Sequence, residues 1–262
     1  MNNTKQFSPT LQSFANLTSD ADNQHSTLLS ALPSLNSVLS EFAPLPRATL
    51  FLGLATDGLP ILLNLLDPLP GPIMITGDEG SGKTNFLRII TSVLDRVHAL
   101  NEVTYSVITD NTAEWKDFQR SRNCEDVFSP RELKVQSHLH SIVAWAHSNK
   151  GGQQIRLLII DRLNSVLEIP EAQQDLNWLL SRGPSRRVWP IVTSNSSIAV
   201  SDLFKPWLDL FRARLFSHIH NDRETQSLTG SSHISFTQLM APFQFAMREG
   251  NDWLPFWIPT LD

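Results

Sequence analysis

The stretch Gly77-Asp78-Glu79-Gly80-Ser81-Gly82-Lys83-Thr84 decides the fold, because it matches the pattern G-x-x-x-x-G-K-[ST] in full. Glycines at these positions let the backbone turn so that its N–H groups surround phosphate oxygens, and the helix that follows adds the positive end of its dipole. We expect Lys83 to reach the β- and γ-phosphates and the Thr84 hydroxyl to ligate Mg²⁺. The motif predicts a nucleotide phosphate site made of Gly77, Asp78, Glu79, Gly80, Ser81, Gly82, Lys83, Thr84 and Asn85. The alternative is a glycine-rich turn between two surface elements.

The flanks of this loop favour the nucleotide site over the surface turn. Upstream, residues 72–76 form a short apolar run that is typical of a buried parallel strand. Downstream, apolar residues recur at helical spacing between Phe86 and Leu94. A strand, a glycine-rich loop and a helix in this order are the context that the motif requires.

A second part of the site is expected where an apolar run over residues 157–160 ends in Asp161. In proteins with such a glycine-rich phosphate-binding loop (P-loop), a carboxylate at the end of the neighbouring strand holds Mg²⁺ through water. The alternative role for Asp161 is that of a helix N-cap. Many hydrolysing P-loop proteins carry a glutamate directly after this aspartate as the base for water, whereas this chain has Arg162. The nearest other carboxylates are Glu168 and Glu79. Binding with slow hydrolysis is therefore the expectation.

Asn195 ends the next strand-like run, which covers residues 189–193. Its side chain either orients attacking water and senses the γ-phosphate, or caps a turn between strand and loop. The predicted catalytic residues are therefore Lys83, Asp161, Asn195 and Glu168, and the predicted metal ligands are Thr84 and Asp161. An arginine that reaches a neighbouring subunit's γ-phosphate would stabilise transition-state charge, although each candidate has the alternative of being an ordinary solvated arginine. The candidates are Arg182, Arg186, Arg187, Arg212 and Arg214.

Strand-like and helix-like runs alternate along the chain, which predicts an α/β fold of the P-loop NTPase class. Its central sheet is expected to be mainly parallel and covered by helices on both faces, with an N-terminal helical segment and a β-hairpin in addition. The expected strands cover residues 49–55, 59–65, 72–76, 103–109, 155–160, 189–193 and 215–219, followed by a closing hairpin over 243–248 and 253–257. The expected helices, after the one that follows the P-loop, cover residues 112–119, 131–148, 172–181 and 203–211.

The segment before residue 48 is expected to differ from the rest. Residues 1–24 have few large apolar residues and predict a disordered tail. Residues 25–47 predict a helical segment and linker, with leucines recurring from Leu28 and Leu29 onward and an interruption at Pro33. This helix packs either on its own domain or on a neighbouring subunit. Residues 48–262 are expected to form the ATPase domain.

Composition narrows the class of protein further. A net charge of −5 and a pI of about 5.9 give no global support for nucleic-acid binding. The single cysteine, Cys124, excludes an internal disulfide and suits a reducing cytoplasm. We expect neither a membrane span nor a signal peptide, because no apolar run is long enough and the N-terminus lacks a basic region followed by an apolar one.

The chain resembles the motor domain of FtsK/SpoIIIE-type DNA translocases, within the wider FtsK–HerA group of P-loop ATPases. The similar residues are a turn and linker over 57–71 that lead into the P-loop, the strand Val107-Ile108-Thr109-Asp110, the strand that ends at Asn195, and Arg214-Leu215-Phe216. The resemblance covers about residues 48 to 257. The chain departs from the family at Arg162, where glutamate is usual, and at Asn195, where glutamine is usual. The residues that follow are too few for the winged-helix module of the full translocases, so a compact relative is expected.

The resemblance implies a RecA-like core, ATP as the nucleotide with Mg²⁺, a homo-oligomer such as a hexameric ring with ATP at subunit interfaces, and double-stranded DNA as a partner. Three functions follow as hypotheses. The first is a cytoplasmic ATP-binding protein with weak or partner-dependent hydrolysis. The second is a non-hydrolysing module in which nucleotide gates oligomerisation or binding of a protein partner. The third is an active double-stranded DNA motor with an unconventional catalytic base.

Overall fold

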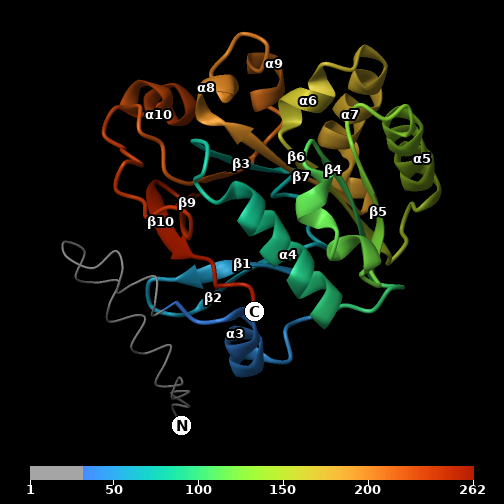
Figure 1. Ribbon diagram of the computed structural model, residues 1–262, viewed down its shortest axis with the longest axis horizontal. Coiled ribbons are helices and arrows are strands. Elements are labelled where there is room, and N and C mark those ends of the chain that lie inside the picture. Colours follow the sequence, from blue (N-terminus) through green and yellow to red (C-terminus); the bar gives the residue numbers. More distant parts are fainter. Residues whose placement is uncertain (1–31) are drawn as a thin grey trace.

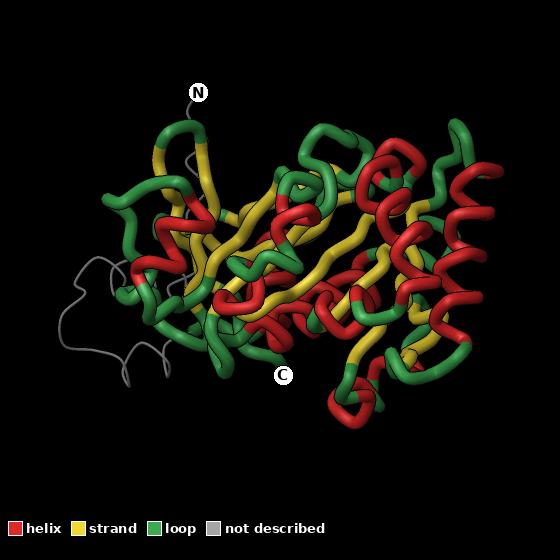
Figure 2. Tube along the Cα trace, turned by 90° about the horizontal axis from the view of Figure 1, so that it is seen from above, coloured by secondary structure: helices red, strands yellow, loops and turns green. Residues whose placement is uncertain are grey.

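The computed structural model describes residues 32–262, and within them ten strands form one sheet in the order β2-β1-β10-β9-β8-β3-β7-β6-β4-β5 (Figure 1). The strands make a continuous twisted layer through the molecule (Figure 2). The predicted fold class is confirmed: the sheet is mixed, mostly parallel around the P-loop strand, and flanked by helices. The first predicted segment, residues 1–24, lies outside the described residues, as do Leu28 and Leu29.

The parallel part of the sheet holds the strand that leads into the P-loop. Strand β3 (Ile73–Gly77) pairs in parallel with β7 (Val188–Asn195) on one side and β8 (Ala213–Phe216) on the other. Beyond β7 follow β6 (Ile155–Asp161), β4 (Val103–Thr109) and β5 (Cys124–Phe128), also parallel. The register sets Gly77 against Asn195 and Thr109 against Asp161. Parallel pairing therefore brings the carboxyl ends of these strands, and their polar residues, to one edge of the sheet.

Two hairpins extend the sheet on its other side. Strands β1 (Thr49–Ala55) and β2 (Pro60–Asn64) form the predicted N-terminal hairpin, and β9 (Gln244–Glu249) and β10 (Asp252–Trp257) form the closing one. Strand β1 pairs with β10, and β9 pairs with β8, all antiparallel. The two ends of the described chain consequently join the same sheet, and a bridge between Ser34 and Thr260 places the C-terminal segment beside helix α3 (Leu35–Phe42).

Side chains of each central strand alternate between two cores, one on each face of the sheet. On β3, Ile73 and Ile75 join the core beneath helix α4 (Lys83–Val97), whereas Met74 joins the opposite core. Helix α3 packs on the same side as α4. The opposite face is covered by α5 (Lys134–Ser148), α6 (Leu163–Leu167), α7 (Pro170–Arg182), α8 (Ser196–Ala199), α9 (Lys205–Leu208) and α10 (Asp222–Thr229). Burial on both faces is the reason that these strands are continuous apolar runs.

Several expected elements differ in the structure. The helix expected over residues 112–119 is instead two 3₁₀ turns, η1 (Thr112–Trp115) and η2 (Phe118–Arg120). The helix expected over 203–211 is reduced to the short helix α9. Of the helical segment expected before residue 48, with its interruption at Pro33, the described part holds α3, which begins after Ser34, whose side chain caps it. Strand β5 and helices α6 and α10 were not predicted, since β5 carries charge and α6 and α10 are short. No helix among residues 32–262 is long and apolar enough to cross a membrane.

Candidate functional site

The P-loop connects the end of β3 to the start of α4 and is tightly enclosed at one point. Gly80 and Gly82 have φ angles of +76° and +94°, in the left-handed region that side chains disfavour. A Cβ atom on Gly82 would lie 1.9 Å from the carbonyl oxygen of Pro242, whereas one on Gly80 would meet nothing within 4 Å. The motif's last glycine therefore permits a close backbone approach, while the middle of the loop stays open toward solvent.

Lys83 lies beneath this loop and is 8% exposed. Its ammonium group donates to the carbonyl oxygens of Gly77 at 2.9 Å and Asp78 at 2.5 Å, and lies 3.4 Å from Ser81 Oγ. Burial lowers the pKa of Lys83 to about 8, against the opposing effect of nearby carboxylates, first that of Asp161. A buried cation without a carboxylate partner in contact is well suited to receive phosphate oxygens.

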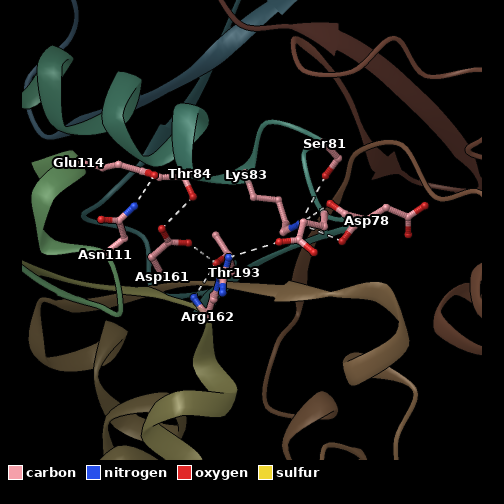
Figure 3. Close-up of polar contacts among 11 residues, drawn as sticks. Asp78, Ser81, Lys83, Thr84, Asn111, Glu114, Asp161, Arg162 and Thr193 are labelled. Atoms are coloured by element: carbon pink, nitrogen blue, oxygen red, sulfur yellow. Dashed lines mark hydrogen bonds and ion pairs between the residues drawn. The ribbon is translucent and has the colours of Figure 1, made fainter. Parts of the chain in front are cut away.

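Asp161 and Thr84 meet at the end of β6 (Figure 3). The Thr84 hydroxyl donates to Asp161 Oδ2 at 2.8 Å, and the Thr193 hydroxyl donates to Oδ1 at 2.7 Å. The Thr193 oxygen in turn accepts the backbone N–H of Arg162 at 2.8 Å, so both carboxylate oxygens have fixed partners. The Thr84 hydroxyl and the Asp161 carboxylate are hard oxygen donors, the type that Mg²⁺ prefers, and thus fit this ion.

The P-loop pocket is a cavity of about 260 Å³ bordered by the predicted motif residues from Glu79 to Asn85, but not by Gly77 or Asp78. It is lined by Glu79, Gly80, Ser81, Gly82, Lys83, Thr84, Asn85, Glu114, Asp161, Arg162 and Asn195. A larger hollow of about 450 Å³, lined by Ile73, Arg214 and Trp253 among others, contains no P-loop residue. The smaller cavity is the one of these two in which backbone donors of the loop, a lysine and a carboxylate converge.

The structure brings together most of the predicted site residues but not Glu168. Asn195 lines the P-loop pocket from the end of β7. Glu168 is exposed at the C-terminal end of α6 and does not line the pocket. Glu79 and Arg162 face each other at the mouth, with their charged atoms 3.8 Å apart.

Three side chains at the site were not predicted from the sequence. Glu114 lines the pocket from η1, and Thr193 fixes Asp161. Ser196 donates to Asp78 Oδ1 at 2.6 Å, while the backbone N–H of His220 donates to Oδ2 at 2.7 Å, so the loop is tied to the chain beyond both β7 and β8. The available signal for Glu114 was its place five residues after the strand that ends at Thr109.

The arginines considered for action on a neighbouring subunit lie outside this pocket. Arg214 donates to the carbonyl oxygens of Leu208 at 2.7 Å and Phe211 at 3.0 Å, and burial lowers its pKa. Arg187 donates to the Leu66 carbonyl oxygen. These contacts give Arg214 and Arg187 structural roles within the chain.

Comparison with known proteins identifies the fold. No protein-family model matches the chain, and no curated protein matches it in sequence. Among solved structures, ATPases 2 and 3 of EccC from Thermomonospora curvata, in complex with a signal sequence peptide, have a TM-score of 0.68 at 14% identity; the match covers 88% of this chain and 43% of that one. The pCW3 conjugation coupling protein TcpA with ATPγS has a TM-score of 0.66 at 12% identity, covering 91% of this chain and 70% of that one.

The genome packaging NTPase B204 of Sulfolobus turreted icosahedral virus 2, in complex with AMPPCP, is smaller. It has a TM-score of 0.50 at 13% identity, and the match covers 74% of this chain and all of that one. This chain thus spans less than half of the EccC structure but more than the packaging NTPase. The resemblance to FtsK/SpoIIIE-type ATPase domains predicted from the sequence is confirmed at the level of the fold.

Proposed function

We propose that this chain is an FtsK/HerA-like P-loop domain that binds Mg·ATP and hydrolyses it weakly or only with a partner. The observation that carries the proposal is the convergence of Lys83, Thr84 and Asp161 under one glycine-rich loop. Two solved structures of the same fold are described as complexes with ATPγS and AMPPCP, which supports an adenine nucleotide as ligand.

Each residue of the site has a defined task in this proposal. Backbone N–H groups of the P-loop and the first turn of α4 bind the β- and γ-phosphates, and Lys83 exchanges its carbonyl partners for phosphate oxygens. Thr84 and Asp161 hold Mg²⁺, which when bound neutralises charge between the phosphates. Thr193 keeps the Asp161 carboxylate in place through the 2.7 Å hydrogen bond. Asn195, at the end of β7, is placed to sense the γ-phosphate or to orient water.

The expectation of weak hydrolysis rests on Arg162. It occupies the position directly after the strand-end aspartate, where an arginine cannot accept a proton. The same observation favours a second candidate, a non-hydrolysing module in which ATP gates oligomerisation or binding of a partner. In either case we place ATP at a subunit interface, since the pocket opens at the surface with Glu79 and Arg162 at its mouth.

The test measures binding of a fluorescent ATP analogue, with Mg²⁺ and with excess EDTA, to the wild type, Lys83→Ala and Lys205→Ala. Lys205 is an exposed lysine paired with Asp202, and it serves as the matched control. We expect Lys83→Ala to weaken Mg²⁺-dependent binding at least about 100-fold, because a buried charge-assisted contact is lost, and Lys205→Ala to have no effect. Equal binding by the wild type and Lys83→Ala would overturn the proposal.

Two further readouts separate the candidate functions. Turnover above roughly 0.1 per second that requires Lys83, especially with double-stranded DNA, indicates a motor. Binding without turnover, together with a nucleotide-dependent change of size in solution, indicates the gated module.

A further inference from the structure

The carboxylate of Glu114 lines the P-loop pocket but has no task in the proposed function. Glu114 lines the pocket together with Thr84 and Asn85, although it is 30 residues away from Thr84 in sequence. Figure 3 shows its side chain on the same side of the pocket as Thr84 and Asp161. This is the side on which the γ-phosphate and its metal ion are held in the proposed function.

The sheet topology puts Glu114 at this position. Strand β4 pairs in parallel with β6, and the register sets Thr109, the last residue of β4, against Asp161. The chain leaves β4 at the same edge of the sheet and turns into η1, which carries Glu114. The carboxylate therefore lies in the turn that follows the strand beside that of Asp161, at the same edge of the sheet.

The turn that carries Glu114 is anchored. Trp115 is fully buried, and its ring lies 5.3 Å from that of Phe118 between the centroids. The Asn111 amide donates to Glu114 Oε1 at 2.6 Å, and the Asn111 backbone N–H donates to Thr109 Oγ1 at 3.2 Å. One carboxylate oxygen is thus oriented by Asn111, while Oε2 has no hydrogen-bond partner among residues 32–262.

The other carboxylates near the pocket are less suited to accept a proton from water. Both oxygens of Asp161 accept threonine hydroxyls, and both oxygens of Asp78 accept hydrogen bonds from Ser196 and the His220 backbone. Glu79 faces Arg162, and Glu168 does not line the pocket. Glu114 is the lining carboxylate that combines an oriented side chain with an available oxygen.

We propose that Glu114 is the general base for ATP hydrolysis in this chain, an inference that rests on the proposed function. A water molecule between Glu114 and the γ-phosphate loses a proton to the Glu114 carboxylate as its oxygen forms a bond to the γ-phosphorus. The bond from that phosphorus to the β,γ-bridging oxygen breaks, and its electron pair stays on ADP. The proton leaves Glu114 with the released phosphate or to solvent. Asn111 acts as a positioning residue that directs the carboxylate.

The experiment compares Glu114→Gln with Glu79→Gln and Glu168→Gln in the full chain, using Mg·ATP as the probe, with and without double-stranded DNA. Glutamine keeps an oxygen for the Asn111 hydrogen bond but cannot take the proton. We expect Glu114→Gln to lower turnover at least about 100-fold while the Kd for Mg·ATP changes less than about threefold. After incubation, the nucleotide recovered from Glu114→Gln should be ATP, and that from the control variant Glu168→Gln should be ADP.

The outcomes distinguish failure of the role assigned to Glu114 from failure of the proposed nucleotide binding. Glu114→Gln that hydrolyses ATP at the wild-type rate would overturn the inference, as would a loss of turnover in Glu79→Gln or Glu168→Gln alone. Wild-type binding without turnover under both conditions would also overturn it, but would leave nucleotide binding intact. Absence of Mg·ATP binding by the folded wild type would instead overturn the proposed function itself. Asn111→Ala, which leaves the carboxylate in place but unguided, should lower kcat without changing the Kd.

Discussion

The P-loop pocket has two sides that differ in how firmly their side chains are held. The buried corner, made of Lys83, Thr84, Asp161 and Thr193, is joined by hydrogen bonds of 2.7 to 2.9 Å around Asp161 and between Lys83 and Gly77. The rim consists of the exposed Glu79, Glu114 and Arg162 and the half-buried Asn195. Its ion pair spans 3.8 Å between side chains that are 84% and 53% exposed at Glu79 and Arg162.

This difference suggests that the corner serves nucleotide binding and the rim serves hydrolysis. In the proposed function the corner is preorganised, so its residues would lose little conformational entropy on binding phosphate and metal. The rim is open to solvent, and an exposed ion pair of this kind contributes little to stability. Substitutions in the corner should therefore affect folding and binding together, whereas substitutions at the rim should alter turnover with little effect on either.

The largest effect is expected from Gly82→Ala, with Gly80→Ala in the same loop as its matched control. Both glycines have positive φ angles, but only at Gly82 would the new Cβ meet a backbone atom, the Pro242 carbonyl oxygen at 1.9 Å. We expect Gly82→Ala to cost at least about 3 kcal/mol of unfolding free energy and to abolish nucleotide binding, and Gly80→Ala to cost about 1 kcal/mol. Urea unfolding measures both. Equal losses would show that the enclosure by Pro242 is unimportant.

The motif predicts Lys83 and Thr84 of the corner, and the end of a strand predicts Asp161, whereas Thr193 was not predicted. The reason for Asp161 is topological. Apolar runs buried on both faces identify parallel strands, and the carboxyl ends of such strands share an edge. Asp161 and Asn195 each follow such a run, as the P-loop follows β3, so their meeting in one pocket is expected from the sequence alone.

The rim and the far side of the sheet are less predictable. Glu114 lies on a 3₁₀ turn that is anchored by the buried Trp115. Such a short turn has no hydrophobic periodicity in the sequence from which its presence or direction could be predicted. The edge strand β5 (Cys124–Phe128) contains charged residues that interrupt its apolar pattern, so it was not predicted. The pairing of β1 with β10 depends on contacts between residues about 200 positions apart, which local patterns do not encode.

A smaller effect concerns the buried charge of Lys83. Its pKa in the folded, nucleotide-free and metal-free protein is about 8 and its ordinary value is 10.5, since burial disfavours the cation. The unfolded chain binds more protons between these values, so this group makes unfolding free energy rise as pH increases through that window. Relative to Lys83→Met, the wild type should gain about 2 kcal/mol between pH 7.5 and 9.5 in chemical unfolding. If the unfolding free energies of the two proteins changed with pH in the same way, the lowered pKa of Lys83 in the folded protein would be contradicted.

The smallest effect tests the rim through Arg162, whose φ of +73° lies in the left-handed region. Arg162→Gly removes backbone strain of about 1 to 2 kcal/mol, and the added freedom of the unfolded chain offsets part of this gain. Because its ion pair with Glu79 is long and exposed, we expect a net rise in unfolding free energy of about 0.5 to 1 kcal/mol and an unchanged Kd for Mg·ATP.

Arg187→Gly is the matched control for Arg162→Gly. Arg187 has a φ of +66°, but its guanidinium donates to the Leu66 carbonyl oxygen, so relief of strain is cancelled by loss of this contact. A thermal unfolding series should place Arg162→Gly above both the wild type and Arg187→Gly. If Arg162→Gly were instead destabilised, or bound Mg·ATP more weakly, Arg162 would contribute to stability and binding as the corner residues do. The division between binding and chemistry would then fail at the position directly after Asp161.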